Sequence, residues 1–78
     1  MQDKFYFKGE HIATNMMLYE KTVEYAKTLE SLKEWVEAYK KFNSVGAPNL
    51  LFQVGYIGST KEANMVKDAL LSAGYAIQ

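Results

Sequence analysis

The pattern of apolar and polar positions changes its period in the C-terminal part of the chain. Residues 50–57 form a mainly apolar run of strand length, rich in the β-branched and aromatic residues that suit a buried strand. The run predicts a central strand over residues 49–57. With a period of two, one set of alternate side chains is expected to face the helices: Leu50, Phe52, Val54 and Tyr56.

A helical spacing follows this run and predicts a helix over residues 60–73. Ser59 and Glu62 have the spacing of a capping box, in which each side chain binds a free amide of the first turn. Gly74 stands where a left-handed C-terminal cap is expected, and Tyr75 where a Schellman ending packs a side chain back on the helix. The tail from Tyr75 to Gln78 is expected to add a short final strand.

The N-terminal part predicts a β-hairpin over residues 4–14, with Lys8 and Gly9 in its turn. Asn15 is a candidate N-cap for the segment that follows. Residues 16–27 fit either a helix or a strand, and the lack of glycine and proline there favours the helix. Thr28 is a candidate N-cap at the point where the periodicity shifts phase, before a second helix over residues 29–43. The apolar stripes of these two helices are Ile12, Met16, Tyr19, Val23 and Ala26, and Leu29, Leu32, Val36, Tyr39 and Phe42.

The predicted fold is therefore a single α+β domain of 78 residues, with a small sheet packed on helices. Its hydrophobic content of 49% is sufficient for a packed core and excludes a disordered chain. No cysteine is present, which excludes disulfides and thiolate zinc sites and suits the cytoplasm. No apolar run is long enough to span a membrane, so we expect no membrane association.

The charge pattern argues against nucleic acid as the main partner. All nine basic residues are lysine, and nine acidic residues balance them. Arginine, which supplies bidentate contacts to phosphate and guanine, is absent. An AT-rich genome would also explain this bias toward lysine.

Candidate catalytic groups are few, and we expect neither an enzyme nor a cofactor or metal ion. His11 is the only histidine and stands beside the predicted turn. Glu20 and Glu24 lie one helical turn apart and could chelate a hard cation, although this spacing is common on solvated helix faces. A nucleophile with a positioned base is missing.

The predicted turn between the strand and the last helix is a candidate ligand site formed by Gly55, Gly58, Ser59, Thr60 and Lys61. Its glycine spacing and its order of Ser, Thr and Lys depart from a phosphate-binding loop.

The segment that contains this turn is similar to one half of a SPOR-type peptidoglycan-binding domain, in the residues Phe52 to Gly55, Ser59, Ala63 and Leu70 to Tyr75. That family uses such a strand–helix unit twice, so the resemblance implies binding of a glycan at the turn. It covers fewer than 30 residues, and residues 1–48 do not repeat it. We therefore treat it as a convergent local pattern.

Four side chains project from the predicted stripes or from the hairpin and are candidate partner contacts: Tyr6, Leu18, Tyr25 and Trp35. Each could instead complete the small core.

We expect a non-enzymatic protein-binding domain, of the kind that phages and mobile elements use to inhibit a host protein, including anti-CRISPR and other anti-defence proteins. The alternative is a small-molecule or glycan-binding module at the turn of residues 55–61. Open edges of the small sheet would also allow a homodimer.

Overall fold

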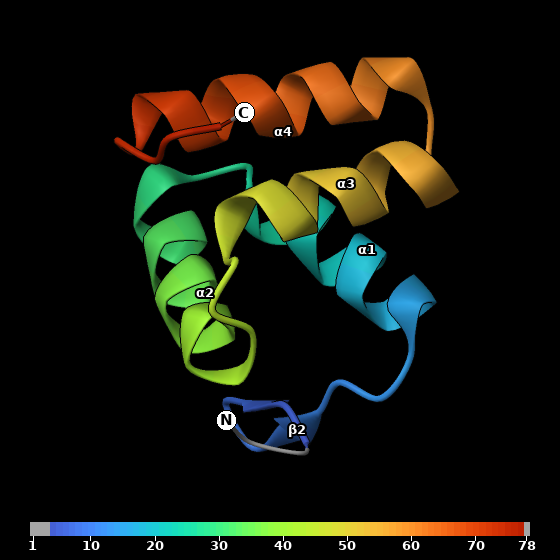
Figure 1. The fold of residues 1–78 in the computed structure, drawn as a ribbon, viewed down its shortest axis with the longest axis vertical. Helices are drawn as coiled ribbons and strands as arrows, with labels where there is room; N and C mark the ends of the chain where they lie inside the picture. The colour runs from blue at the N-terminus through green and yellow to red at the C-terminus, as the bar shows by residue number, and fades with distance from the viewer. Residues whose placement is uncertain (1–3, 78) are drawn as a thin grey trace.

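The computed structural model describes residues 4–77, which form one short hairpin and four helices (Figure 1). The strands are β1 (Tyr6–Phe7) and β2 (Glu10–His11). The helices are α1 (Asn15–Tyr25), α2 (Leu29–Phe42), α3 (Ala47–Ile57) and α4 (Thr60–Ser72). The chain is thus mostly helical, consistent with a small α+β fold. Helices α3 and α4 run antiparallel side by side, and the hairpin lies at the opposite end of the molecule from α4 (Figure 1).

The predicted hairpin is present at the N-terminus. Tyr6 pairs with His11 and Phe7 with Glu10 in an antiparallel register. Lys8 and Gly9 have positive φ angles of 51° and 80°, as a two-residue hairpin turn whose twist matches its strands requires. Each strand has 2 residues, so the sheet offers a partner only a short edge.

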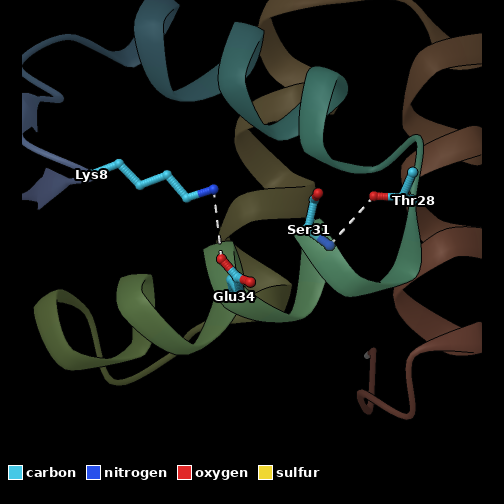
Figure 2. A network of polar contacts seen from close by, with 4 residues as sticks. All are labelled: Lys8, Thr28, Ser31 and Glu34. Atoms are coloured by element: carbon cyan, nitrogen blue, oxygen red, sulfur yellow. Dashed lines mark hydrogen bonds and ion pairs between the residues drawn. The ribbon is translucent and has the colours of Figure 1, made fainter.

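The three helices predicted over residues 16–27, 29–43 and 60–73 are confirmed as α1, α2 and α4. The break between the first two lies at Thr28, whose hydroxyl accepts a hydrogen bond of 3.4 Å from the Ser31 amide (Figure 2). The predicted N-cap of α1 is wrong by one residue. Thr14, and not Asn15, has the extended backbone and caps the helix.

Both predicted ends of α4 are confirmed. Ser59 accepts from the Glu62 amide while the Glu62 carboxylate accepts from the Ser59 amide, which completes the capping box. At the other end, the Tyr75 amide donates to the Leu70 carbonyl at 3.1 Å, and Gly74 has a φ of 95°. This is the Schellman ending that the sequence indicates.

The central strand predicted over residues 49–57 is wrong, because this segment lies in the helix α3. A short apolar run bounded by glycines fits a buried strand or a buried helix equally well when only its periodicity is considered. The signal that distinguishes them is Pro48, which lies in the first turn of α3, where its missing amide has no cost. Leu50 and Val54, four residues apart, are buried on the inward face of this helix.

The short final strand is also not formed, since residues 75–77 have no regular structure and Gln78 lies outside the described residues. The Schellman ending places Tyr75 partly buried against the core. The sheet therefore consists of β1 and β2 alone within residues 4–77.

Trp35 lies at the centre of the core, with no exposed surface. Its ring centroid lies 5.1 Å from that of Phe5, 5.2 Å from that of Phe7 and 5.3 Å from that of Tyr25. These rings join the hairpin to α1 and α2, and the exposed ion pair of Lys8 with Glu34, at 3.6 Å, crosses the same junction (Figure 2).

The inward face of α1 differs from the predicted stripe. Leu18 and Thr22 are its buried residues, whereas Met16 is exposed. Thr22 can be buried because its hydroxyl donates to the Leu18 carbonyl at 2.7 Å and accepts from the Trp35 indole N–H at 3.0 Å. The stripe of α2 is confirmed at Leu32, Val36 and Tyr39, but Leu29 is exposed.

Candidate functional site

The outer face of α3 carries two large aromatic side chains that the fold leaves in solvent. Phe52 is 63% exposed and Tyr56 is 79% exposed. They lie four residues apart on one side of the helix, and their rings stack with centroids 6.2 Å apart and an angle of 17° between planes. Because the segment is a helix, Phe52 and Tyr56 do not face the core with Leu50 and Val54, as the strand prediction required.

A second property of this face is its lack of charge. From Phe42 to Thr60 the chain contains no charged residue, although charged residues make up 23% of the sequence. The helix therefore presents apolar side chains on its buried face and on much of its exposed face. Charged residues are depleted at the centre of protein interfaces, and aromatic residues are enriched there.

A groove of about 470 Å³ lies between α3 and α4, next to the two rings. We call it the α3–α4 groove, and its lining residues are Leu51, Phe52, Gly55, Tyr56, Ala63, Asn64 and Lys67. Gly55 keeps it open, because a Cβ atom at this position would lie in van der Waals contact with Ala63 Cβ, at 3.8 Å. Lys67 is the only charged residue of this lining.

Helix α4 is held along its length by the buried side chains of Val66 and Leu70, and at its N-terminus by a contact with α1 at the tight turn after α3. The Tyr19 hydroxyl of α1 donates to both carboxylate oxygens of Glu62, at 2.7 and 2.8 Å. This hydrogen bond, with that from the Ser59 amide, lowers the pKa of Glu62, and the same carboxylate raises the pKa of Tyr19. A Cβ atom at Gly58 would lie 2.6 Å from Tyr19 Cε1, so only glycine allows this approach. Tyr19 of α1 thus packs against the turn that joins the two helices of the groove.

The predicted partner contacts are not brought together. Trp35 and Leu18 are buried in the core, so the expectation that they project into solvent is wrong. Tyr25 is partly buried against Trp35. Tyr6 is exposed and stacks on His11 of the hairpin, with centroids 4.8 Å apart. Of the four, only Tyr6 presents most of its side chain to solvent.

The predicted ligand site at residues 55–61 does not form a strand–helix turn, because both flanking segments are helices. Gly55 lies inside α3 and lines the α3–α4 groove, whereas Gly58, Ser59, Thr60 and Lys61 are not among its lining residues. The cap of α4 is already occupied by the Glu62 carboxylate, which an incoming anion would have to displace. The strand half of the SPOR-like unit is likewise helical.

The candidate catalytic residues lie apart from the groove. Glu20 and Glu24 border a separate hollow of about 310 Å³ on α1, together with Glu10, Met17 and Lys21. Lys21 forms an ion pair of 2.9 Å with Glu10 there. Within residues 4–77 there is no group of three or more metal-binding side chains that could hold an ion. His11 follows Glu10 in β2, is not among the residues that line this hollow, and stacks on Tyr6.

Comparison with known proteins found no match to a protein-family model, a curated protein or a solved structure. No helix within the described part of the chain is both long enough and apolar enough to cross a membrane.

Sequence reasoning missed the α3–α4 groove. The signal that could have revealed it is the combination of Pro48 as a helix start with the absence of charge from Phe42 to Thr60. Read as a helix, the segment shows apolar residues on more of its circumference than a single buried face needs.

Proposed function

We propose that the protein is a small, non-enzymatic protein-binding domain whose partner contacts the α3–α4 groove and the rings of Phe52 and Tyr56. The observation that carries this proposal is the exposed, stacked aromatic pair on an uncharged helix beside an apolar groove. Aromatic residues in such positions are the anchors that supply most of the binding free energy of protein interfaces.

The size of the exposed apolar surface supports the proposal. A Phe or Tyr side chain presents about 150–250 Å², so the two exposed rings together offer on the order of 300 Å². Adding the groove lining brings the patch into the range of roughly 300–600 Å² that the largest apolar patch of a monomer reaches, where such patches are often functional. Scattered exposed residues such as Met65 need no such explanation.

The form of this function that we propose is inhibition of a host protein by a phage or mobile-element protein, of the anti-CRISPR or other anti-defence type, in the cytoplasm. A small domain that offers an apolar contact surface of this kind is suited to act by covering a surface of its partner. Nucleic acid is disfavoured as the main partner, because phosphate binding requires clustered basic residues and this surface offers Lys67 alone.

The test is an affinity pull-down from a lysate of the source cell or of its host, using wild-type protein and two matched variants. Phe52→Ser with Tyr56→Ser removes the two rings, while Tyr6→Ser removes another exposed aromatic ring, which lies on the hairpin. We expect one stoichiometric partner that the first variant loses and the second retains. A partner that is retained without the two rings, or one that is lost without Tyr6, would refute the proposal. Circular dichroism checks that both variants fold.

A small-molecule or glycan ligand is the second candidate, because the groove volume of about 470 Å³ lies within the range of ligand sites. Of the five residues predicted to bind a ligand, Gly55 lines this groove, whereas Gly58, Ser59, Thr60 and Lys61 do not. Stabilisation of wild-type protein by a compound in thermal unfolding, absent in the Phe52→Ser, Tyr56→Ser variant, would favour this candidate over the protein partner.

A further inference from the structure

We propose that the occupant of the α3–α4 groove is an amphipathic helix of the partner, with an acidic residue placed against Lys67. This inference rests on the proposed function and specifies the chemistry of the partner segment. Two properties of the groove support it. The backbone groups of its walls are already hydrogen-bonded within α3 and α4, and Lys67 is the one charged residue of its lining.

The groove walls favour a helical occupant over an extended peptide. An extended peptide has unpaired amides and carbonyls, and binding sites for it usually supply a strand edge to pair with them. Both walls here are helices, α3 and α4, whose interior backbone groups are already bonded within each helix. The polar groups of the lining side chains are limited to Asn64, Lys67 and the hydroxyl of Tyr56, which do not form a continuous edge that could pair with a strand. An occupant must therefore satisfy its own backbone, which a helix does.

The shape of the groove fits the apolar stripe of a short helix. Gly55 and Ala63, the smallest residues of the lining, let a side chain approach closely at the centre. Phe52 and Tyr56 form one wall over one turn of α3. Leu71, which is exposed four residues beyond Lys67, extends the apolar surface along α4. Leucine-like anchors spaced at i, i+3, i+4 and i+7 on the occupant match a surface of this length.

The charge of the groove calls for an acidic group on the occupant. Lys67 is exposed and has no ion pair among residues 4–77, as is the case for most lysines of this part of the chain; the lysines with a glutamate partner are Lys8, Lys21 and Lys40. The residues three and four positions from Lys67 on α4 are Ala63, Asn64, Leu70 and Leu71, none of which is acidic. A carboxylate on the flank of the bound helix would give this ammonium group its counter-charge.

The same charge pattern disfavours a second copy of the chain as the occupant. A two-fold pairing of this surface would bring together two uncharged α3 helices and two Lys67 side chains. No carboxylate of the lining would be available to either lysine. Self-association through this face therefore leaves its one charge uncompensated at the interface.

The test uses two synthetic helical peptides of about four turns, titrated into ¹⁵N-labelled protein. Both carry leucines at i, i+3, i+4 and i+7, and they differ only in having glutamates or lysines along one flank. We expect the acidic peptide to bind about five- to tenfold more tightly, the ratio expected when a partly exposed ion pair is replaced by a like-charge contact. The amide signals of Gly55, Ala63 and Asn64 should shift on binding. Because the net charge of the protein is zero, overall attraction cannot produce this preference.

Two charge variants on α4 provide the matched control. Lys67→Glu should reverse the preference, so that the basic peptide binds more tightly. Lys61→Glu makes the same change on α4 outside the groove and should leave the preference for the acidic peptide unchanged. Equal affinities for the two peptides, binding that shifts amides elsewhere, or no saturable binding of either peptide would overturn the inference. So would a wild-type dimer in sedimentation equilibrium that dissociates on Tyr56→Ser. The three peptide outcomes do not decide the proposed function. That function would still stand if the pull-down recovers a partner whose capture depends on Phe52 and Tyr56.

Discussion

The hydrogen bond between Thr22 and Trp35 gives the sharpest prediction about the stability of the fold. Thr22→Val keeps the size and branching of the side chain but removes the acceptor of the indole N–H, which lies 3.0 Å from the hydroxyl. Both residues have no exposed surface, so water cannot replace the lost partner without a rearrangement. A buried donor left without a partner costs about 1–3 kcal/mol.

This loss is large relative to the stability expected for a chain of 78 residues, which is about 4–12 kcal/mol. We expect the midpoint of thermal unfolding to fall by about 4–8 °C for each kcal/mol lost. Urea unfolding, followed by the fluorescence of Trp35, gives the free energy directly in the wild type and in Thr22→Val.

A double-mutant cycle with Trp35→Phe isolates the hydrogen bond from packing. Trp35→Phe removes the N–H donor, so Thr22→Val should cost at least about 1 kcal/mol less in that background, with unfolding followed by circular dichroism. A coupling free energy below about 0.5 kcal/mol would refute the reasoning. It would mean that the Thr22 hydroxyl is not needed to satisfy the indole.

Three further predictions follow from the groove and the contacts around it. Gly55→Ala should stabilise the protein by about 0.5–1 kcal/mol in urea unfolding, because Gly55 lies inside α3 and the added methyl meets Ala63 at an ordinary contact distance; a loss of stability would contradict the helical assignment of this segment. The lowered pKa of Glu62 means that its stabilising effect is complete above the ordinary carboxyl pKa of 4.5 and is lost as the pH falls through the lower folded-state value. Unfolding free energies between pH 6 and about 3 should therefore fall less steeply in Tyr19→Phe than in the wild type, and equal slopes would contradict the role of this hydrogen bond. Gly58→Ala should destabilise the protein in the same urea assay, since the Cβ atom of the alanine would lie 2.6 Å from Tyr19 Cε1. An unchanged midpoint of urea unfolding would show that the Tyr19 ring does not lie this close to residue 58 in solution.

The sequence predicts those parts of the fold that depend on local signals. The capping box of Ser59 and Glu62, the ending at Gly74 and the N-cap at Thr28 each specify a helix end through neighbouring backbone groups, and all three are confirmed. The hairpin is likewise encoded by its turn, because Lys8 and Gly9 adopt the positive φ angles that it requires.

The parts that the sequence does not predict depend on contacts between distant residues. Thr22 is a polar residue in the core, and although its hydroxyl donates to the nearby Leu18 carbonyl, its second partner is Trp35, thirteen positions away on another helix. The segment of α3 is apolar on both faces, and which apolar residues are buried depends on whether the period is 2 or 3.6. The wrong period assigned Phe52 and Tyr56 to the core and so concealed the candidate site. For Leu18 and Trp35 the sequence leaves a partner surface and the core as alternatives. The core position is decided by packing between distant elements, because rings of the hairpin and of α1 surround Trp35.

The central claim is that partner binding depends on the aromatic pair of α3 and not on the aromatic residues of the hairpin. The most direct measurement is calorimetric titration of the recovered partner into the wild type, the Phe52→Ser, Tyr56→Ser variant and Tyr6→Ser. Interface anchors cost at least about 2 kcal/mol each when truncated, so the loss of both rings costs about 4 kcal/mol when the two effects add, and we predict that the affinity of the first variant falls by roughly 700-fold. Tyr6→Ser should stay within about threefold of the wild type, which is the scale of a peripheral residue. Unchanged affinity without the two rings, or a large loss on Tyr6→Ser, would contradict the claim.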